Sequence, residues 1–142
     1  MGKQRILLVE DDTRFREVFA RALGRAMAAE SHDVAFVEAG SLAEAKERLR
    51  EGRLDAALID VRLPDGGGLD LVRELHDGGV GSLIPTLVLT AYLDHTVAAR
   101  AMDAGAKGAL SKVVSVPETV EAIKRLTRAL GSRGDERTLA VA

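Results

Sequence analysis

Polar side chains that suit phosphoryl transfer stand directly after short apolar segments at four points of the sequence. They are Glu10, Asp11, Asp12, Asp60, Thr90 and Lys112. Clustered carboxylates raise one another's pKa values unless a cation lies between them, and Mg²⁺ prefers carboxylate oxygens, water and phosphate as ligands. A carboxylate beside such an ion can attack phosphorus and form an aspartyl phosphate. The residue types therefore predict metal-assisted phosphoryl transfer, provided the fold brings the four points together.

Thr90 and Lys112 complete this chemistry. A threonine hydroxyl can donate a hydrogen bond to a phosphoryl oxygen, and a lysine ammonium can neutralise its charge. A single acidic residue at the end of a strand is usually only solvated, so one of these residues alone would indicate little. Four polar points with the charges that Mg²⁺ and phosphate require are hard to explain by solvation, and together they favour a site.

Apolar runs alternate with segments of helical periodicity along the chain. The apolar runs are 6–9, 34–37, 56–59, 86–90 and 108–111. The helical segments are 15–27, 41–49, 69–75, 97–102 and 117–130. This alternation predicts an α/β fold with a doubly wound, five-stranded parallel sheet and helices on both faces. Because ligands of such sheets bind in the crevice beyond the carboxyl ends of the strands, we expect the four polar points to meet there.

Specific signals mark some of the boundaries between these segments. Ser41 and Glu44 form a capping-box pattern, in which each side chain accepts a backbone N–H at the start of the second helix. Gly105 is expected to end the fourth helix, as a C-terminal glycine often does. The stretch 64–68, with one proline and three glycines, is expected to be a flexible turn before the third helix.

The composition fits one globular domain. Of the 142 residues, 46% are hydrophobic and 30% charged, which is the balance of a folded rather than a disordered protein. The net charge of −2 gives no reason to expect nucleic-acid binding, and no apolar stretch approaches the ~20 residues of a membrane span. The absence of cysteine excludes thiolate metal sites. We therefore expect a cytoplasmic protein with no membrane partner and no direct nucleic-acid binding by this segment, with a domain at 1–130 and a C-terminal tail or the start of a linker at 131–142.

The sequence resembles the receiver domains of bacterial two-component systems from residue 5 to about residue 130. Segment 6–12 is similar to the first strand and acidic pocket of that family. Segment 60–69 is similar to its phosphoacceptor segment, including a glycine eight residues after the aspartate. Thr90 and Lys112 match the remaining positions of the family pattern. The resemblance implies the flavodoxin-like strand order 2-1-3-4-5.

The resemblance also implies a role for each polar residue. Asp60 is the phosphoacceptor, and Thr90 and Lys112 bind the phosphoryl group and report its arrival. The implied groups around Mg²⁺ are the carboxylates of Asp11 and Asp60, the backbone carbonyl of Arg62 and, through water, Glu10. Asp12 lies beyond the acidic pair and is not assigned to the metal.

By the same resemblance, the protein is a signalling switch and catalyses only its own phosphorylation and dephosphorylation. A histidine kinase or a phosphotransfer protein supplies the phosphoryl group, and phosphorylation changes the face that binds a downstream target or a fused output domain. The sequence itself identifies neither the kinase nor the target.

The sequence departs from the family pattern at three places. Segment 107–108 lacks the acidic residues that one large subgroup of transcription factors carries there for dimer contacts, and two single positions also differ. Ala109 replaces an aromatic residue that usually swings inward on activation, and Val113 replaces the proline that commonly follows the lysine. A cis bond before a residue other than proline costs about 2.5–4 kcal/mol, so we expect a trans Lys112–Val113 bond, with the lysine stem still long enough to reach the pocket.

The departures at Ala109 and Val113 favour one alternative function, a pseudo-receiver that binds partners but is not switched by phosphate. A third possibility is a small phosphatase that forms an aspartyl phosphate during turnover. Such an enzyme should carry Asp-x-Asp directly after a strand, and the segment 60–62 reads Asp-Val-Arg. The phosphorylation switch therefore remains the preferred hypothesis.

Overall fold

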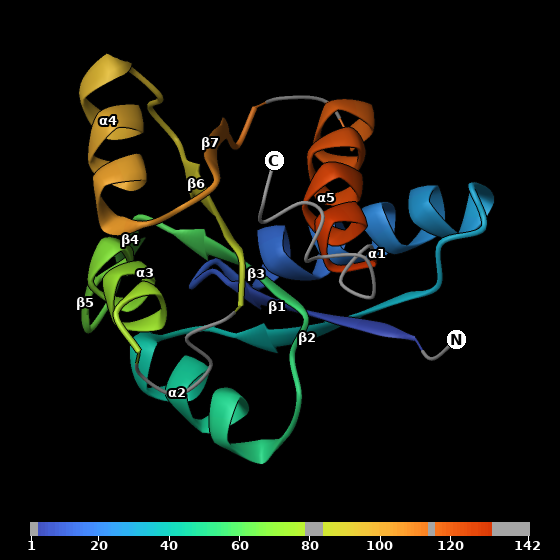
Figure 1. The fold of residues 1–142 in the computed structure, drawn as a ribbon, viewed down its shortest axis with the longest axis horizontal. Coiled ribbons are helices and arrows are strands. Elements are labelled where there is room, and N and C mark those ends of the chain that lie inside the picture. The colour runs from blue at the N-terminus through green and yellow to red at the C-terminus, as the bar shows by residue number, and fades with distance from the viewer. Residues whose placement is uncertain (1–2, 79–83, 114–115, 132–142) are drawn as a thin grey trace, which may run out of the picture.

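The computed structural model describes residues 3–78, 84–113 and 116–131, and its central element is a five-stranded parallel sheet (Figure 1). The strands of the sheet are β1 (Gln4–Val9), β2 (Val34–Ala39), β3 (Ala56–Asp60), β6 (Thr86–Thr90) and β7 (Gly108–Ser111). They lie in the order β2-β1-β3-β6-β7, and every neighbouring pair is parallel. Counted along the chain, this is the order 2-1-3-4-5, so the predicted fold class and topology are confirmed.

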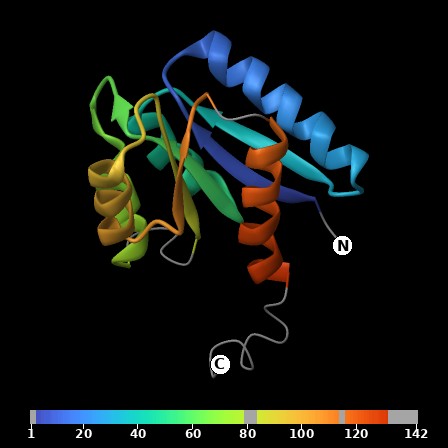
Figure 2. The ribbon, with the colours of Figure 1, turned by 90° about the horizontal axis from the view of Figure 1, so that it is seen from above.

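Helices cover both faces of the sheet, as Figure 2 shows. They are α1 (Thr13–Ala29), α2 (Leu42–Glu51), α3 (Gly68–His76), α4 (His95–Ala104) and α5 (Val116–Gly131). Helices α1 and α5 pack on one face through an apolar layer that includes Leu23 and Ile123. Helices α2, α3 and α4 pack on the other face through a layer that includes Leu49 and Leu75. Because strand side chains alternate between the two layers, the apolar runs of β1, β3 and β6 belong to strands buried on both faces, whereas the edge strands β2 and β7 are mostly half-buried.

Local signals in the sequence set several boundaries of these helices. The Ser41 hydroxyl accepts the Glu44 N–H at 3.1 Å, and the Glu44 carboxylate reaches back to the Gly40 N–H at 2.6 Å. Glu44 thus accepts from the residue before the cap rather than from the cap itself, a shift of one position from the predicted capping box. Gly105 ends α4 with φ +112°, the left-handed conformation expected there.

The segment after β3 differs from the predicted flexible turn. Residues Arg62–Leu63 (β4) and Gly66–Gly67 (β5) pair as a short antiparallel hairpin. Gly68 is the first residue of α3 rather than part of the turn. Two-residue strands carry no periodicity, so neither feature could be predicted from the pattern of apolar residues.

Strand β7 is followed by Lys112 and Val113, where the sequence predicts a trans peptide bond. The peptide bond between Lys112 and Val113 is trans, as predicted. Residues 132–142, most of the predicted tail, lie outside the described part of the chain, so the boundary at residue 130 stays a prediction. Within the residues that the structure describes, no helix is both long and apolar enough to cross a membrane.

Candidate functional site

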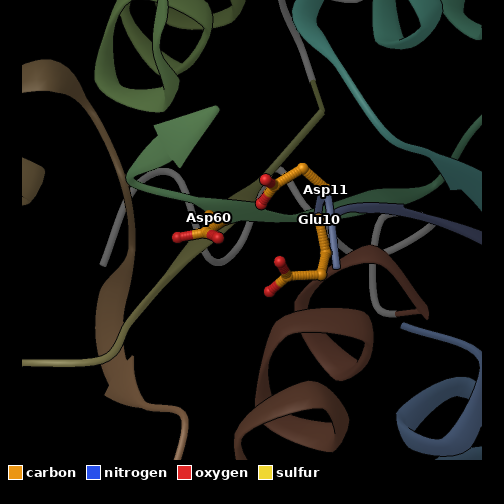
Figure 3. A group of neighbouring side chains, drawn as sticks. All are labelled: Glu10, Asp11 and Asp60. Carbon is orange, nitrogen blue, oxygen red and sulfur yellow. The ribbon is translucent and has the colours of Figure 1, made fainter. Parts of the chain in front are cut away.

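The polar residues singled out in the sequence meet at the carboxyl edge of the sheet. Parallel pairing aligns the ends of β1 and β3 through Val9 and Ile59, so the residues that follow them are neighbours. One carboxylate oxygen from each of Glu10, Asp11 and Asp60 lies within 4.8 Å of the others. Figure 3 shows these three side chains gathered where β1 and β3 end. The fold therefore brings together groups that are about 50 residues apart in the chain.

Lys112 places its ammonium inside this cluster. Its Nζ atom donates to Asp60 Oδ2 at 2.9 Å and forms a close ion pair with Glu10 Oε1. Burial of the ammonium lowers the pKa of Lys112, but the hydrogen bonds to Glu10 and Asp60 outweigh that effect and leave the pKa raised. Lys112 therefore stays charged and acts as the cation of the cluster. Its Nζ atom also lies 5.2 Å from the centre of the Phe15 ring.

Glu10 is the most deeply buried member of the cluster, with no exposed surface. Burial raises the pKa of Glu10, and the nearby Asp60 charge acts in the same direction, whereas Lys112 and the Asp12 N–H oppose the shift. Glu10 Oε2 accepts the Asp12 N–H at 3.0 Å. Within the described residues, Glu10 Oε1 has the Lys112 ion pair but no well-aligned hydrogen-bond donor. The Oε1 atom of Glu10 is thus held by the ion pair with Lys112 and not by an aligned hydrogen bond.

The cluster fits a hard divalent cation. Its three carboxylates face a single ammonium, so the site carries excess negative charge that a second cation would offset. All the candidate side-chain ligands are oxygen atoms, the type that Mg²⁺ prefers. Asp11 is exposed, which leaves its carboxylate accessible to an ion arriving from solvent. Glu10 Oε1, which pairs with the Lys112 ammonium, can accept a further donor such as a metal-bound water.

Thr90 and Arg62 border the cluster. Thr90 is buried at the end of β6, and its Oγ1 accepts the Tyr92 N–H at 3.2 Å, which leaves the hydroxyl proton free to be donated. The Thr90 carbonyl accepts the Lys112 N–H at 2.8 Å, so the two residues are joined through the backbone. Arg62 donates its backbone N–H to Asp60 Oδ1 at 3.2 Å, while its side chain is exposed.

Three further residues support the site, of which only Gly68 was singled out in the sequence, as part of the turn and of the family pattern. Gly68 lies against the backbone of Asp60, Arg16 donates to the backbone of Glu10, and Asp65 accepts from the start of α2. The contacts of Arg16 and Asp65 join residues distant in sequence to the loops around the cluster. Sequence spacing gives no sign of such contacts, because each depends on how separate elements of the chain pack together in the fold.

Asp65 fixes the hairpin to helix α2. Its two carboxylate oxygens accept the backbone N–H groups of Leu42 and Ala43 at 2.8 and 3.0 Å. These two groups would otherwise lack partners at the helix N-terminus. The same hydrogen bonds hold the pKa of Asp65 below its ordinary value.

We predict that Asp65→Asn destabilises the protein at neutral pH and does so less in acid. A carboxyl with a lowered pKa stabilises the fold above its unfolded pKa of about 3.9 and loses that contribution as the pH falls through its folded pKa. The measurement is the urea midpoint of wild type and Asp65→Asn at pH 7 and at pH 3. The difference in urea midpoint between wild type and Asp65→Asn should be smaller at pH 3 than at pH 7. Glu47→Gln, an exposed change on helix α2, should show no such dependence on pH. A gap of equal size at both pH values would contradict the assigned cap.

Comparisons with known proteins agree with this geometry. The profile of the response regulator receiver domain family matches residues 6–124. The DNA-binding transcriptional activator DevR/DosR of Mycobacterium tuberculosis is 37% identical over 123 residues, which cover 84% of this chain and 52% of that protein. The response regulator protein PilR of Pseudomonas aeruginosa is 32% identical over 136 residues, covering 96% of this chain and 29% of that protein. The chain thus spans about half or less of the length of these relatives.

Solved structures show the same likeness. A two-component response regulator of the LuxR family from Aurantimonas sp. superposes with a TM-score of 0.76 and 30% identity, covering 87% of this chain and 84% of that one. The receiver domain of a sensor histidine kinase from Pseudomonas aeruginosa has a TM-score of 0.73 and 26% identity, covering 88% of this chain and 98% of that one. That neighbour holds a magnesium ion coordinated in its active-site cleft.

Proposed function

The chain belongs to the response regulator receiver domains, a family with a role in phosphorylation-type signalling, and on that basis we propose that it is a switch that accepts a phosphoryl group on Asp60 in a Mg²⁺-dependent reaction. The observation that carries the proposal is the placement of Asp60, buried at the end of β3 beside the Lys112 ammonium and close to the acidic pair Glu10 and Asp11. A nucleophile, a cation for the phosphoryl oxygens and a set of metal ligands are then within reach of one another.

In the proposed reaction, an Asp60 carboxylate oxygen attacks the phosphorus of the donor. A bond forms between that oxygen and phosphorus, while the bond to the leaving group breaks and its electron pair departs with the imidazole of a phosphohistidine or, when acetyl phosphate is the donor, with the acetate that is released. Lys112 and the Thr90 hydroxyl donate to the phosphoryl oxygens. A bound Mg²⁺, held by Asp11, Asp60 and the Arg62 carbonyl with Glu10 through water, would offset the charge that develops on those oxygens.

The donor would be a histidine kinase or a phosphotransfer protein, and the receiver would control a downstream target or a fused output domain. Such a switch needs a coupling from the pocket to the surface. A backbone hydrogen bond joins Thr90 and Lys112. The backbone N–H of Tyr92, whose side chain is exposed, donates a hydrogen bond to the Thr90 hydroxyl oxygen. Movement of Thr90 and Lys112 toward a phosphoryl group would therefore displace the start of the loop that leads to α4, without an aromatic residue at Ala109.

We predict that acetyl phosphate adds one phosphoryl group to the wild-type chain when Mg²⁺ is present and none when Mg²⁺ is chelated. Asp60→Asn should abolish the modification, because an amide is not a nucleophile toward phosphorus under these conditions. Intact-mass spectrometry is the measurement, with Asp70→Asn, an exposed change in α3, as the control that should be modified like wild type. Equal labelling of wild type and Asp60→Asn would assign the phosphoryl group to another residue.

The pseudo-receiver remains the second candidate, and the small side chain of Ala109 is the observation that favours it. A pseudo-receiver function predicts that neither acetyl phosphate nor a histidine kinase modifies the folded wild-type protein. The same mass measurement therefore separates the two functions.

A further inference from the structure

Arg16 lies behind the acidic pair and contacts it through the backbone. Its side chain, on helix α1, is only 15% exposed. The guanidinium Nη1 donates to the carbonyl oxygen of Glu10 at 2.7 Å, and Nε donates to Glu38 Oε1 at 2.9 Å. A single side chain thus connects α1, the end of β2 and the residue at which β1 passes into the acidic pair.

The space that Arg16 occupies depends on Gly40. A β-carbon at Gly40 would lie 3.1 Å from Arg16 Nη1 and 3.9 Å from the Glu10 carbonyl oxygen. The first of these distances is too short for an unstrained contact, so a side chain at Gly40 would crowd the guanidinium. Glu10 also donates its N–H to the Ala39 carbonyl at 2.9 Å. Both backbone groups of Glu10 are therefore held.

The Glu10 carbonyl belongs to the same rigid peptide group as the Asp11 nitrogen. Fixing that carbonyl consequently fixes the plane from which the Asp11 side chain projects. The planar guanidinium offers several N–H donors in a fixed arrangement, so it can serve a carbonyl and a carboxylate at the same time. A lysine at this position has a single nitrogen and cannot reproduce the same fork.

We propose that Arg16 is a positioning residue of the pocket, which holds the Glu10–Asp11 peptide group so that both carboxylates face Asp60. This inference rests on the proposed Mg²⁺ site and adds a residue that lies outside the ligand set. The proposal predicts that the loss of Arg16 weakens Mg²⁺ binding. Charge alone would predict the opposite, because removing a positive charge reduces the repulsion of a cation. Because Glu38 already pairs with Arg16, the change in electrostatic potential at the site is small, and the loss of positioning dominates.

The test is the Mg²⁺ dissociation constant of the full chain, measured by isothermal titration calorimetry on folded variants. Arg16→Met should raise that constant about tenfold, the usual effect of removing a residue that orients a metal ligand. The paired variant Arg16→Met/Glu38→Gln restores the wild-type net charge and should show the same loss. Arg14→Met, an exposed change two residues earlier in α1, should stay within about twofold of wild type.

Arg16→Lys should recover only part of the affinity, and it serves as the deciding variant if Arg16→Met does not fold. A Kd within twofold of wild type in the folded Arg16 variants, whatever their melting temperatures, would overturn the proposal and leave Arg16 as a structural ion pair. If the wild type itself does not bind Mg²⁺, the proposed metal site fails, a result that the wild-type titration shows by itself. Weaker binding in Arg16→Met that the paired variant reverses would assign the effect to the unpaired Glu38 carboxylate, not to the lost contact with the Glu10 carbonyl, and would likewise overturn the proposal.

Discussion

Gly68→Ala is expected to destabilise the fold by about 1–3 kcal/mol or more and to abolish phosphorylation of Asp60. A β-carbon at Gly68 would lie 1.8 Å from the Asp60 carbonyl oxygen and 3.0 Å from Ile59 Cγ2. The first of these atoms is backbone, so the strand that carries the phosphoacceptor or the start of α3 must move. The Gly68 N–H also donates to the Val61 carbonyl at 2.7 Å, and that bond would be stretched by either movement.

Gly67→Ala provides the matched control for this prediction. Its β-carbon would meet only Asp70 Oδ2, at an ordinary 3.7 Å, and φ at Gly67 is −84°, which alanine adopts without strain. We expect a neutral or slightly stabilising effect of up to about 1 kcal/mol, because alanine restricts the unfolded chain. Urea unfolding of the three proteins gives the comparison. A Gly68→Ala protein as stable as Gly67→Ala would contradict the close approach of α3 to Asp60.

Lys112→Met is expected to have the second large effect, and its size should depend on Mg²⁺. Removing one partner of a buried ion pair costs about 3–5 kcal/mol. The Lys112 side chain is 20% exposed, so we expect a loss toward the lower end of that range in metal-free buffer. Glu10 and Asp60 would then face each other without a cation between them. A bound Mg²⁺ should offset part of the loss, since at one hundred times its Kd a ligand stabilises the folded state by about 2.7 kcal/mol.

Urea unfolding with and without Mg²⁺ is the measurement for Lys112→Met. The stability gap between wild type and the variant should shrink when Mg²⁺ is added, because the ion takes over the charge compensation that the ammonium supplies. Lys107→Met, an exposed change just before β7, should show a small effect that Mg²⁺ does not alter. A gap that is the same in both buffers would mean that Lys112 and the metal do not share the pocket carboxylates.

Much of this fold could be predicted because its central strands, β1, β3 and β6, are buried on both faces. Continuous apolar runs ended by polar residues indicated both the parallel sheet and the edge at which Glu10, Asp60 and Lys112 meet. The expected reach of Lys112 into the pocket is also found, despite Val113 in place of proline. These features depend on residue type and on order along the chain, and both can be seen in a sequence.

The supporting contacts could not be predicted, because they depend on tertiary distances. Arg16 lies four residues after Asp12 on an amphipathic helix, a position that normally indicates only an exposed charge, yet it reaches Glu38, 22 residues away. Asp65 stands in a glycine-rich segment that resembles a flexible turn, yet it caps a helix 22 and 23 residues earlier. In both cases the partner lies in another element, strand β2 for Arg16 and the start of helix α2 for Asp65, and the two come together only once the sheet and its helices have packed.

The central claim is that Asp60 carries the phosphoryl group, and the most direct test is to locate that group. Borohydride reduces an aspartyl phosphate to homoserine, so the modified residue keeps a permanent mark through digestion. Trypsin should release residues 54–62, which contain Asp55 and Asp60, separately from residues 6–14, which contain Asp11 and Asp12. After treatment with acetyl phosphate and Mg²⁺, we predict homoserine at position 60 alone. Homoserine at position 11, 12 or 55 would contradict the assignment. The absence of homoserine in protein that intact mass shows to be phosphorylated would contradict it as well.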